Sequence, residues 1–300
     1  MGECEKFPST VERYHERFAR VLTHIEYHSD TALSIDDLSD IAAFSRHHFH
    51  RQFSGYLGMS AYRYVQYMRM RRASWRLAFR PELSVNDIAI ATGYEGPESF
   101  ARAFRQYTGQ SPTGFRAGPD WPEWHSRFRP FIHLRQSHMN PLPNPGPVRV
   151  VSFTATRVAK LEHRGSVLRL GDSIRKFIDW RRANALPPHV SATFNIIHND
   201  PDETPPEEFR FDLCAATDRP IEPNDTGVTA YVIPGGRCAV LRHVGSDDQL
   251  GRSIMHLYAN WLPASGEEPR DAPLFMQRLK FFPDVPDGEA VTDIYLPLAG

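Results

Sequence analysis

The sequence contains no apolar run that approaches the ~20 residues needed to cross a bilayer. Its N-terminal stretch, MGECEKFPSTVERYHERF, carries acids and no hydrophobic segment, so we expect no signal peptide. The cysteines are few and far apart, at Cys4, Cys214 and Cys238, and have neither metal-site nor redox-motif spacing. These absences argue against an integral membrane protein and a disulfide scaffold, and they predict a cytoplasmic protein.

A formal net charge of −1 also lacks the positive excess of a nucleic-acid-binding protein, but the average hides a local bias. No Asp or Glu occurs between Ser45 and Arg80, whereas the chain after Pro147 is acidic. The acid-free segment contains Arg46, Arg51, Arg63, Arg69, Arg71, Arg72, Arg76 and Arg80. Such clustering is typical of a phosphate-binding surface, although a solvated helix face is the alternative.

An internal repeat spans this basic region. Residues 34–64 resemble residues 84–115, with a spacing of 50 residues at Asp37 and Asp87 that becomes 51 at Phe49 and Phe100. Each copy reads as a short helix, a tight turn and a second helix. Ser and Asp three residues apart predict capping-box-like starts, and Gly93 supplies the second turn. The stretch from Ser60 to about Phe79 predicts a connecting helix of about 30 Å, close to one turn of B-DNA at roughly 34 Å.

The tandem pattern, the sequence SFARAFRQYTGQSPTGFR and the arginine-rich connecting helix resemble the DNA-binding domain of the AraC/XylS family. The resemblance covers residues 14–117. It implies an all-α double helix-turn-helix domain that reads double-stranded DNA with the second helix of each copy. The residues that match the base-reading positions are Arg46, His47, His50, Arg51, Glu98, Ala101 and Arg102. We expect phosphate contacts from Arg63, Arg69, Arg72 and Arg105.

The histidines of the first copy also raise the possibility of a metal site, since His47 and His50 share a helix face. No carboxylate or cysteine lies near them in the sequence, and structural zinc sites need four ligands at recognisable spacing. We therefore expect no metal and no other cofactor.

The C-terminal half is duplicated as well. LEHRGS at 161–166 recurs as LRHVGS at 241–246, and Trp180, Phe194 and Asp212 recur 81 residues later as Trp261, Phe275 and Asp293. Each copy reads as a strand, a helix ending near a Trp, and two strands. Together with NDPDETPPEEFRFDLC and YANWLPASG, the pattern resembles the GyrI-like effector-binding domain over residues 147–300. The resemblance implies an α+β fold with pseudo-twofold symmetry and a small-molecule groove between the copies. We expect residues 118–146, which are rich in Pro and aromatics, to form a semi-rigid linker that packs partly on one domain.

By position, the residues expected to line this effector pocket are Phe194, Asn195, His198, Trp261, Phe275, Met276 and Arg278. Many GyrI-like domains carry a buried Glu in the strand that here reads LFMQRLKFFP, where Met276 and Gln277 stand instead. The carboxylate that would attract a cation is missing from this strand. An inward-pointing Arg278 would favour an anionic or neutral polar ligand, whereas an outward-pointing one would leave the groove less selective.

The whole pattern predicts a multidomain transcription regulator whose activity is modulated by a small molecule, with RNA polymerase as a further partner and no membrane association. The alternatives are a small-molecule hydrolase and a protein-binding module formed by the GyrI-like half. Without the Glu, a hydrolase loses its natural general base, so we expect no enzymatic activity.

Overall fold

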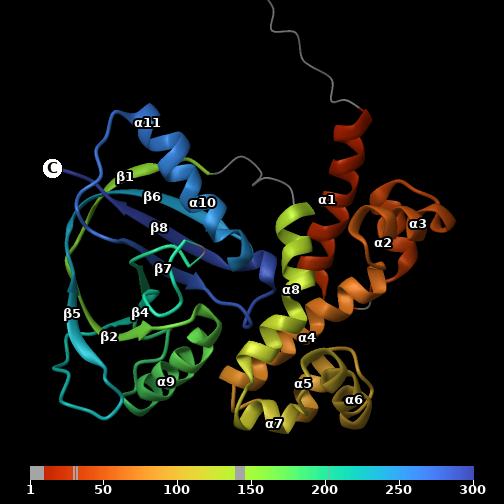
Figure 1. Ribbon diagram of the computed structural model, residues 1–300, viewed down its shortest axis with the longest axis horizontal. Coiled ribbons are helices and arrows are strands. Elements are labelled where there is room, and N and C mark those ends of the chain that lie inside the picture. Colours follow the sequence, from red (N-terminus) through yellow and green to blue (C-terminus); the bar gives the residue numbers. More distant parts are fainter. Residues whose placement is uncertain (1–9, 30, 32, 139–145, 202) are drawn as a thin grey trace, which may run out of the picture. The chain divides into compact units, whose positions relative to one another are not determined.

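The computed structural model describes residues 10–29, 31, 33–138, 146–201 and 203–300 (Figure 1). The chain divides into two compact units. The first holds the described residues up to 116, with 127–138 and 286–288, and the second holds the rest. Cys4 lies outside the described residues.

The N-terminal half is entirely helical, as predicted. Its helices are α1 (Thr10–His28), α2 (Ile35–Ala42), α3 (Arg46–Leu57), α4 (Ala61–Phe79), α5 (Val85–Ala91), α6 (Pro97–Thr108), α7 (Pro112–Ala117) and α8 (Trp121–His138). None of the described helices is long and apolar enough to cross a membrane.

The two helix pairs α2–α3 and α5–α6 form as the repeat predicts. The Asp37 amide donates to Ser34 Oγ over 3.0 Å at the start of α2. Ser84 and Asp87 form a complete, reciprocal capping box at the start of α5. Within each second helix, one turn separates two fully buried phenylalanines, whose ring centroids lie 5.4 Å apart in α3 and 5.5 Å apart in α6. These rings hold each pair together.

The expected linker contains a helix. Asp120 caps α8, and the buried Phe128 and Phe131 pack against Tyr67 of α4, with the rings of Phe131 and Tyr67 stacked at 5.1 Å. Arg135 Nε donates to Glu26 of α1 over 3.1 Å, and both side chains are buried. The Pro-rich composition concealed this helix, whose apolar side chains pack against α4. Residues 139–145 of the linker lie outside the described residues.

The C-terminal half is an α+β unit built on a curled, eight-stranded antiparallel sheet (Figure 1). Its strands are β1 (Arg149–Phe153), β2 (Thr156–Arg164), β3 (Thr193–Ile197), β4 (Arg210–Ala216), β5 (Thr229–Ile233), β6 (Gly236–Val244), β7 (Leu274–Lys280) and β8 (Val291–Pro297). The helices are α9 (Leu170–Ala183), α10 (Leu250–His256) and α11 (Leu262–Ser265).

The strand order β1-β6-β8-β7-β3-β4-β2-β5 reveals the pseudo-twofold symmetry. β3 and β7 meet at the centre, and each copy gains an initial strand that the sequence did not predict, β1 or β5. Each initial strand pairs with the opposite copy, since β1 pairs with β6 and β5 with β2. Neither copy is therefore a complete sheet by itself.

The repeated LEHRGS and LRHVGS segments form the same turn twice. Gly165 and Gly245 have φ of 123° and 126°, which other residues rarely adopt. His243 Nε2 faces the Ser246 carbonyl oxygen at 3.0 Å and Nδ1 lies 2.8 Å from Ser253 Oγ. Because only a donor satisfies the carbonyl, Nε2 donates and the neutral Nδ1 accepts from the serine. Burial lowers the pKa of His243, which favours this neutral form.

The sheet has two faces of different composition. The helix face carries Leu161, Leu213, Met276 and Ile294, which form two cores with residues of α9 and of the segment around α10. The inner face, toward which the sheet curls, carries a third core of strand residues: Val158, Phe194, Ile196, Cys214, Ile233, Cys238 and Phe275. Among the described residues, no helix of this unit contributes a side chain to that third core.

Candidate functional site

The outer face of α3 is polar and basic. Arg46, His47, His50 and Arg51 are all exposed, opposite the buried Phe49 and Phe53. Arg46 lies 3.5 Å from the Asp36 carboxylate in an exposed ion pair. The predicted reading residues of the first copy thus share one accessible surface.

The equivalent surface of α6 is smaller and less basic. Glu98 and Arg102 are exposed, whereas Ala101 is half-buried. Arg102 occupies the position of Arg51 in the repeat, one residue after the half-buried alanine. The structure brings the predicted residues of this copy together, but only Arg102 among them carries positive charge.

The basic run along α4 is not one exposed face. Arg63 is exposed, with its guanidinium 5.7 Å from the Tyr67 ring centroid, and Arg105 of α6 is exposed as well. Arg72 is buried at 4% exposure. Arg69 donates from Nε to the Ser29 carbonyl and from Nη2 to the Thr31 carbonyl, over 2.9 and 2.8 Å. Of the predicted phosphate-contacting residues, Arg63 and Arg105 are therefore accessible. Arg72 is buried in the helical unit, and Arg69 is hydrogen-bonded within it.

The starts of the second helices differ from those of the first helices. Serine side chains cap α2, α4 and α5, whereas the N-caps of α3 and α6, Ser45 and Gly96, make no side-chain capping bond. Unbonded backbone N–H groups and the positive end of the helix dipole favour a phosphate at such a terminus.

On the inner face of the sheet, four aromatic rings form a cluster. Phe275 and Tyr295 stack with centroids 4.8 Å apart, and Phe153 lies 4.8 Å from Phe275 and 6.1 Å from Phe194. Cys214 and Cys238 are free, buried thiols on the same face. Burial raises the pKa of both thiols, so they stay protonated and behave as small apolar side chains.

The residues predicted to line the effector pocket are divided between the two faces. Phe194 and Phe275 lie on the inner face. Met276 lies in the helix-face core, against which Trp261 packs. Asn195 pairs with Met276 across the strands and therefore shares its face. Successive side chains of a strand alternate between faces, so neighbours such as Phe275 and Met276 cannot line one pocket.

Arg278 also lies on the helix face, where it forms an ion pair with Asp247 and donates from Nε to Asn195 Oδ1 over 3.1 Å. The Asp247 carboxylate therefore already pairs with its positive charge. The sequence left open whether this arginine points into the groove, and its position assigns it no role on the inner face.

Two buried carboxylates lie on the inner face, at repeat-equivalent positions. Arg242 donates to both oxygens of Asp293, over 2.7 and 2.8 Å. His198 Nε2 lies 2.8 Å from Asp212, and Lys160 lies 3.5 Å away. Burial opposes ionisation of Asp212, but the His198 hydrogen bond and the nearby cations outweigh it and lower its pKa. Asp293 is thus bound through both oxygens, whereas Asp212 Oδ1 is buried and has no hydrogen-bond partner among the described residues.

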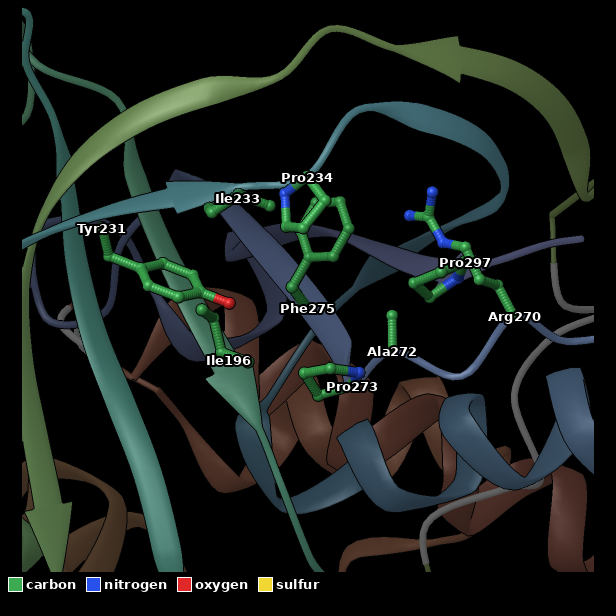
Figure 2. A pocket seen from close by; sticks show the side chains of 9 residues that line it. All are labelled: Ile196, Tyr231, Ile233, Pro234, Arg270, Ala272, Pro273, Phe275 and Pro297. Carbon is green, nitrogen blue, oxygen red and sulfur yellow. The ribbon is translucent and has the colours of Figure 1, made fainter.

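A narrow, partly open hollow lies on this face (Figure 2). Its lining comprises Ile196, Tyr231, Ile233, Pro234, Arg270, Ala272, Pro273, Phe275 and Pro297. Figure 2 shows Tyr231 and Arg270 at opposite ends, with Phe275, Ala272 and Pro273 between them. Only Phe275 of this lining was predicted. The alternation within β7, LFMQRLK, was the available signal, because it separates Phe275 from Met276.

Among the described residues, no group of three or more His, Cys, Asp or Glu side chains is placed to hold a metal ion. His47 and His50 of α3 have no such partners there.

Comparison with known proteins finds a matching family for each half of the chain. Residues 146–299 match the family described as GyrI-like small molecule binding domain, and residues 38–118 match a helix-turn-helix domain family. The probable transcriptional regulator YgiV of Escherichia coli (strain K12) is 40% identical over 153 residues, 51% of this chain and 96% of YgiV. An uncharacterized HTH-type transcriptional regulator of Staphylococcus aureus (strain COL) is 30% identical over 101 residues, 34% of this chain and 13% of that protein.

Among solved structures, the cryo-EM structure of an EcmrR–DNA complex aligns with 88% of this chain and 98% of its own, at 14% identity and a TM-score of 0.42. The match over residues 146–299 and the 40% identity to YgiV establish the family. The chain belongs to the GyrI-like family, and it joins that small-molecule-binding domain to an AraC-type helix-turn-helix DNA-binding domain of transcription regulators.

Proposed function

We propose that this chain is a sequence-specific transcription regulator that reads double-stranded DNA through α3 and α6 and responds to a small molecule on the inner face of its sheet. The observation that carries the proposal is the duplicated helix pair with Arg51 and Arg102 exposed at equivalent positions. Between the copies, the 19 residues of α4 span about 28 Å, near the pitch of B-DNA.

Base reading is assigned first to α3, where His47, His50 and Arg51 are exposed together. Arginine can donate two hydrogen bonds to guanine, and histidine can donate or accept at several base edges. In α6, Arg102 does most of the reading, Glu98 lies at the rim, and Ala101 offers only a methyl contact. The uncapped starts of α3 and α6, with Arg63 and Arg105, supply phosphate contacts.

The experiment begins with genome-wide mapping of the sites that the full chain occupies, which supplies an operator. Replacing Arg51 or Arg102 by Ala should then weaken operator binding by about 1–3 kcal/mol and relax specificity at one base position. Arg164→Ala, which removes an exposed arginine at the end of β2, is the matched control and should leave the affinity unchanged. Operator affinity that survives both reader substitutions would refute the base-reading assignment.

We further propose that the GyrI-like unit acts as a sensor without catalysis. Met276 and Gln277 stand where many GyrI-like domains are expected to carry a Glu, and Gln277 accepts a hydrogen bond from Tyr295 over 3.3 Å. The other candidate bases are His198, which lies 2.8 Å from Asp212, and His163, which lies 2.8 Å from Ser173 Oγ. A ligand should raise the thermal midpoint of the protein without product formation, and should alter its contacts with the operator or with RNA polymerase. Catalytic turnover of the ligand would overturn the sensor assignment.

A further inference from the structure

We propose that the free edge of β5 and the hollow beside it form a docking site for an extended, acidic peptide segment of a partner protein. The peptide adds a strand to the sheet along β5, and Arg157 and Arg219 bind its carboxylates. This inference goes beyond the proposed function, because the surface involves neither the DNA-reading helices nor a small molecule.

β5 is an edge strand with outward-facing backbone groups. It ends the strand order of the sheet and pairs with β2 alone among the described strands (Figure 1). The Arg157 carbonyl accepts a hydrogen bond from the chain that follows β4, so the next residue, Val158, directs its backbone toward Tyr231 of β5. The alternation along β5 then directs the N–H and C=O groups of Ala230 and Val232 away from the sheet. Both residues are exposed, so a further strand has access to these groups.

An open hollow of about 490 Å³ lies beside this edge. Its volume is within the roughly 300–1,000 Å³ that is typical of ligand sites. Ile221, Ala230 and Val232 supply apolar lining, and Arg157 and Arg219 supply two exposed cations. Arg157 directly faces Val232 across the strand pair, so their side chains lie on the same face. A strand added along β5 therefore places alternate side chains next to both apolar surface and positive charge.

The positive charges at this hollow have no acidic partner. Within the described part of the chain, the Arg157 guanidinium makes neither an ion pair nor a hydrogen bond. Arg219 Nη1 donates to the Asn184 carbonyl oxygen over 3.0 Å, and no carboxylate of the described residues pairs with it. The segment 217–228 carries three exposed acids, but none of them lines the hollow. The charge that lines the hollow is therefore positive.

The other copy of the repeat shows what satisfies such an arginine. In the alignment of LEHRGS with LRHVGS, Arg237 of β6 is the equivalent of Arg157. It donates from Nη2 to the Glu267 carboxylate and from Nη1 to the Ala299 carbonyl oxygen, over 2.8 and 3.1 Å. The first copy has Leu186 at the position of Glu267 and lacks that carboxylate. A partner that supplies a carboxylate and an extended main chain reproduces both contacts, which favours an acidic peptide as the occupant.

A second copy of this chain is a poorer occupant of the edge. Antiparallel pairing of β5 with itself would bring the Arg157 and Arg219 side chains of both copies to one interface, where like charges repel. β5 reads TAYVI and contains no acid that would balance them. An acidic strand meets opposite charge instead.

The test measures the binding of three fluorescein-labelled peptides to the full chain by fluorescence anisotropy. The first, Thr-Glu-Val-Glu-Val-Glu-Thr, places its glutamates on one face of a strand. The second has Lys in place of Glu, and the third has the first sequence on an N-methylated backbone, which keeps the charges and loses the amide donors. The first peptide should bind most tightly, and Arg157→Gln or Arg219→Gln should weaken it by about fivefold. Arg237→Gln, which removes the equivalent arginine that already has partners, is the matched control and should retain peptide binding.

Val232→Pro tests the backbone contacts separately. It removes an outward N–H that takes no part in the pairing with β2, and edge strands tolerate proline. The variant should bind the first peptide about tenfold more weakly, while an unchanged thermal midpoint shows that the fold is retained.

Equal affinity for the lysine peptide, or undiminished affinity in Arg157→Gln, would refute the acidic-peptide site. Binding of the N-methylated peptide as tightly as the first would mean that the arginines attract carboxylates without strand addition, which would overturn the docking site. A concentration-dependent dimer that Val232→Pro disrupts, without peptide binding, would assign the edge to a second copy and overturn the proposal as well.

Discussion

At the scale of single residues, the two helix-turn-helix copies have different residue types at the left-handed position of the turn. Ala43 follows α2 with a φ of 53°, whereas Gly93 follows α5 with a φ of 81°. The left-handed region costs a residue with a Cβ roughly 1–2 kcal/mol, and glycine avoids this cost. Part of the gain is lost because glycine is more flexible in the unfolded chain.

Ala43→Gly should therefore stabilise the protein, by about 0.5–1 kcal/mol in the free energy of unfolding. Gly93→Ala is the matched substitution in the other copy and should have the opposite sign. Its new Cβ would lie 2.9 Å from Arg69 Nη1, which belongs to a guanidinium fixed by two carbonyl oxygens. Urea unfolding of both variants measures the difference. A loss of stability in Ala43→Gly would show that the positive φ carries no strain.

At the scale of elements, two equivalent glycines of the C-terminal repeat allow the packing at the start of α8 to be tested. Gly171 of α9 and Gly251 of α10 are equivalent glycines, but a Cβ at Gly171 would lie 2.3 Å from the Trp121 indole, whereas nothing lies within 4 Å at Gly251. Trp121 is 2% exposed and has little room to yield.

Gly171→Ala should lower the free energy of unfolding by about 1–3 kcal/mol, as overpacking does. Gly251→Ala should raise it by about 0.5–1 kcal/mol, because alanine is the better helix former. Thermal and urea unfolding of the two variants test the pair. Equal effects in both helices would mean that the start of α8 does not pack on α9.

The elements themselves were largely predictable from the sequence, because their signals are local. Ser84 and Asp87, Gly93 and Pro97 mark helix ends through bonds to nearby residues. α8 was missed because its prolines suggested a linker, although Trp121, Trp124, Phe128 and Phe131 recur at helical spacing. β1 and β5 were missed for another reason, since their partners belong to the opposite copy.

At the scale of the whole molecule, a chain of net charge −1 should nevertheless bind DNA with strong salt dependence, because the phosphates meet only its local positive charge. Arg63→Ala and Arg105→Ala should each reduce the slope of log K against log salt by about 1 and weaken different sequences equally. The buried Arg72 and the bonded Arg69 should not be used in this test, since their loss would disturb the helical unit. A slope unchanged in both variants would remove these arginines from the phosphate contacts.

The two sites differed in how far the sequence could define them. The reading face of α3 follows from helical periodicity once Phe49 and Phe53 are placed inside. The pocket depends on long-range strand pairing, which brings Tyr231 of β5 and Phe275 of β7 onto one face with Arg270.

Because β1 pairs with β6 and β5 pairs with β2, neither copy can form its part of the sheet without a strand from the other. A chain cut between β4 and β5 would yield fragments that each expose an unpaired edge, and each fragment would need the other to complete its sheet. A single copy made alone would have to close as a symmetric pair of identical chains, each lending its first strand to the other. The covalent duplication turns such a dimer into one polypeptide, so the two halves can differ in sequence, as the unlike strands β3 and β7 do.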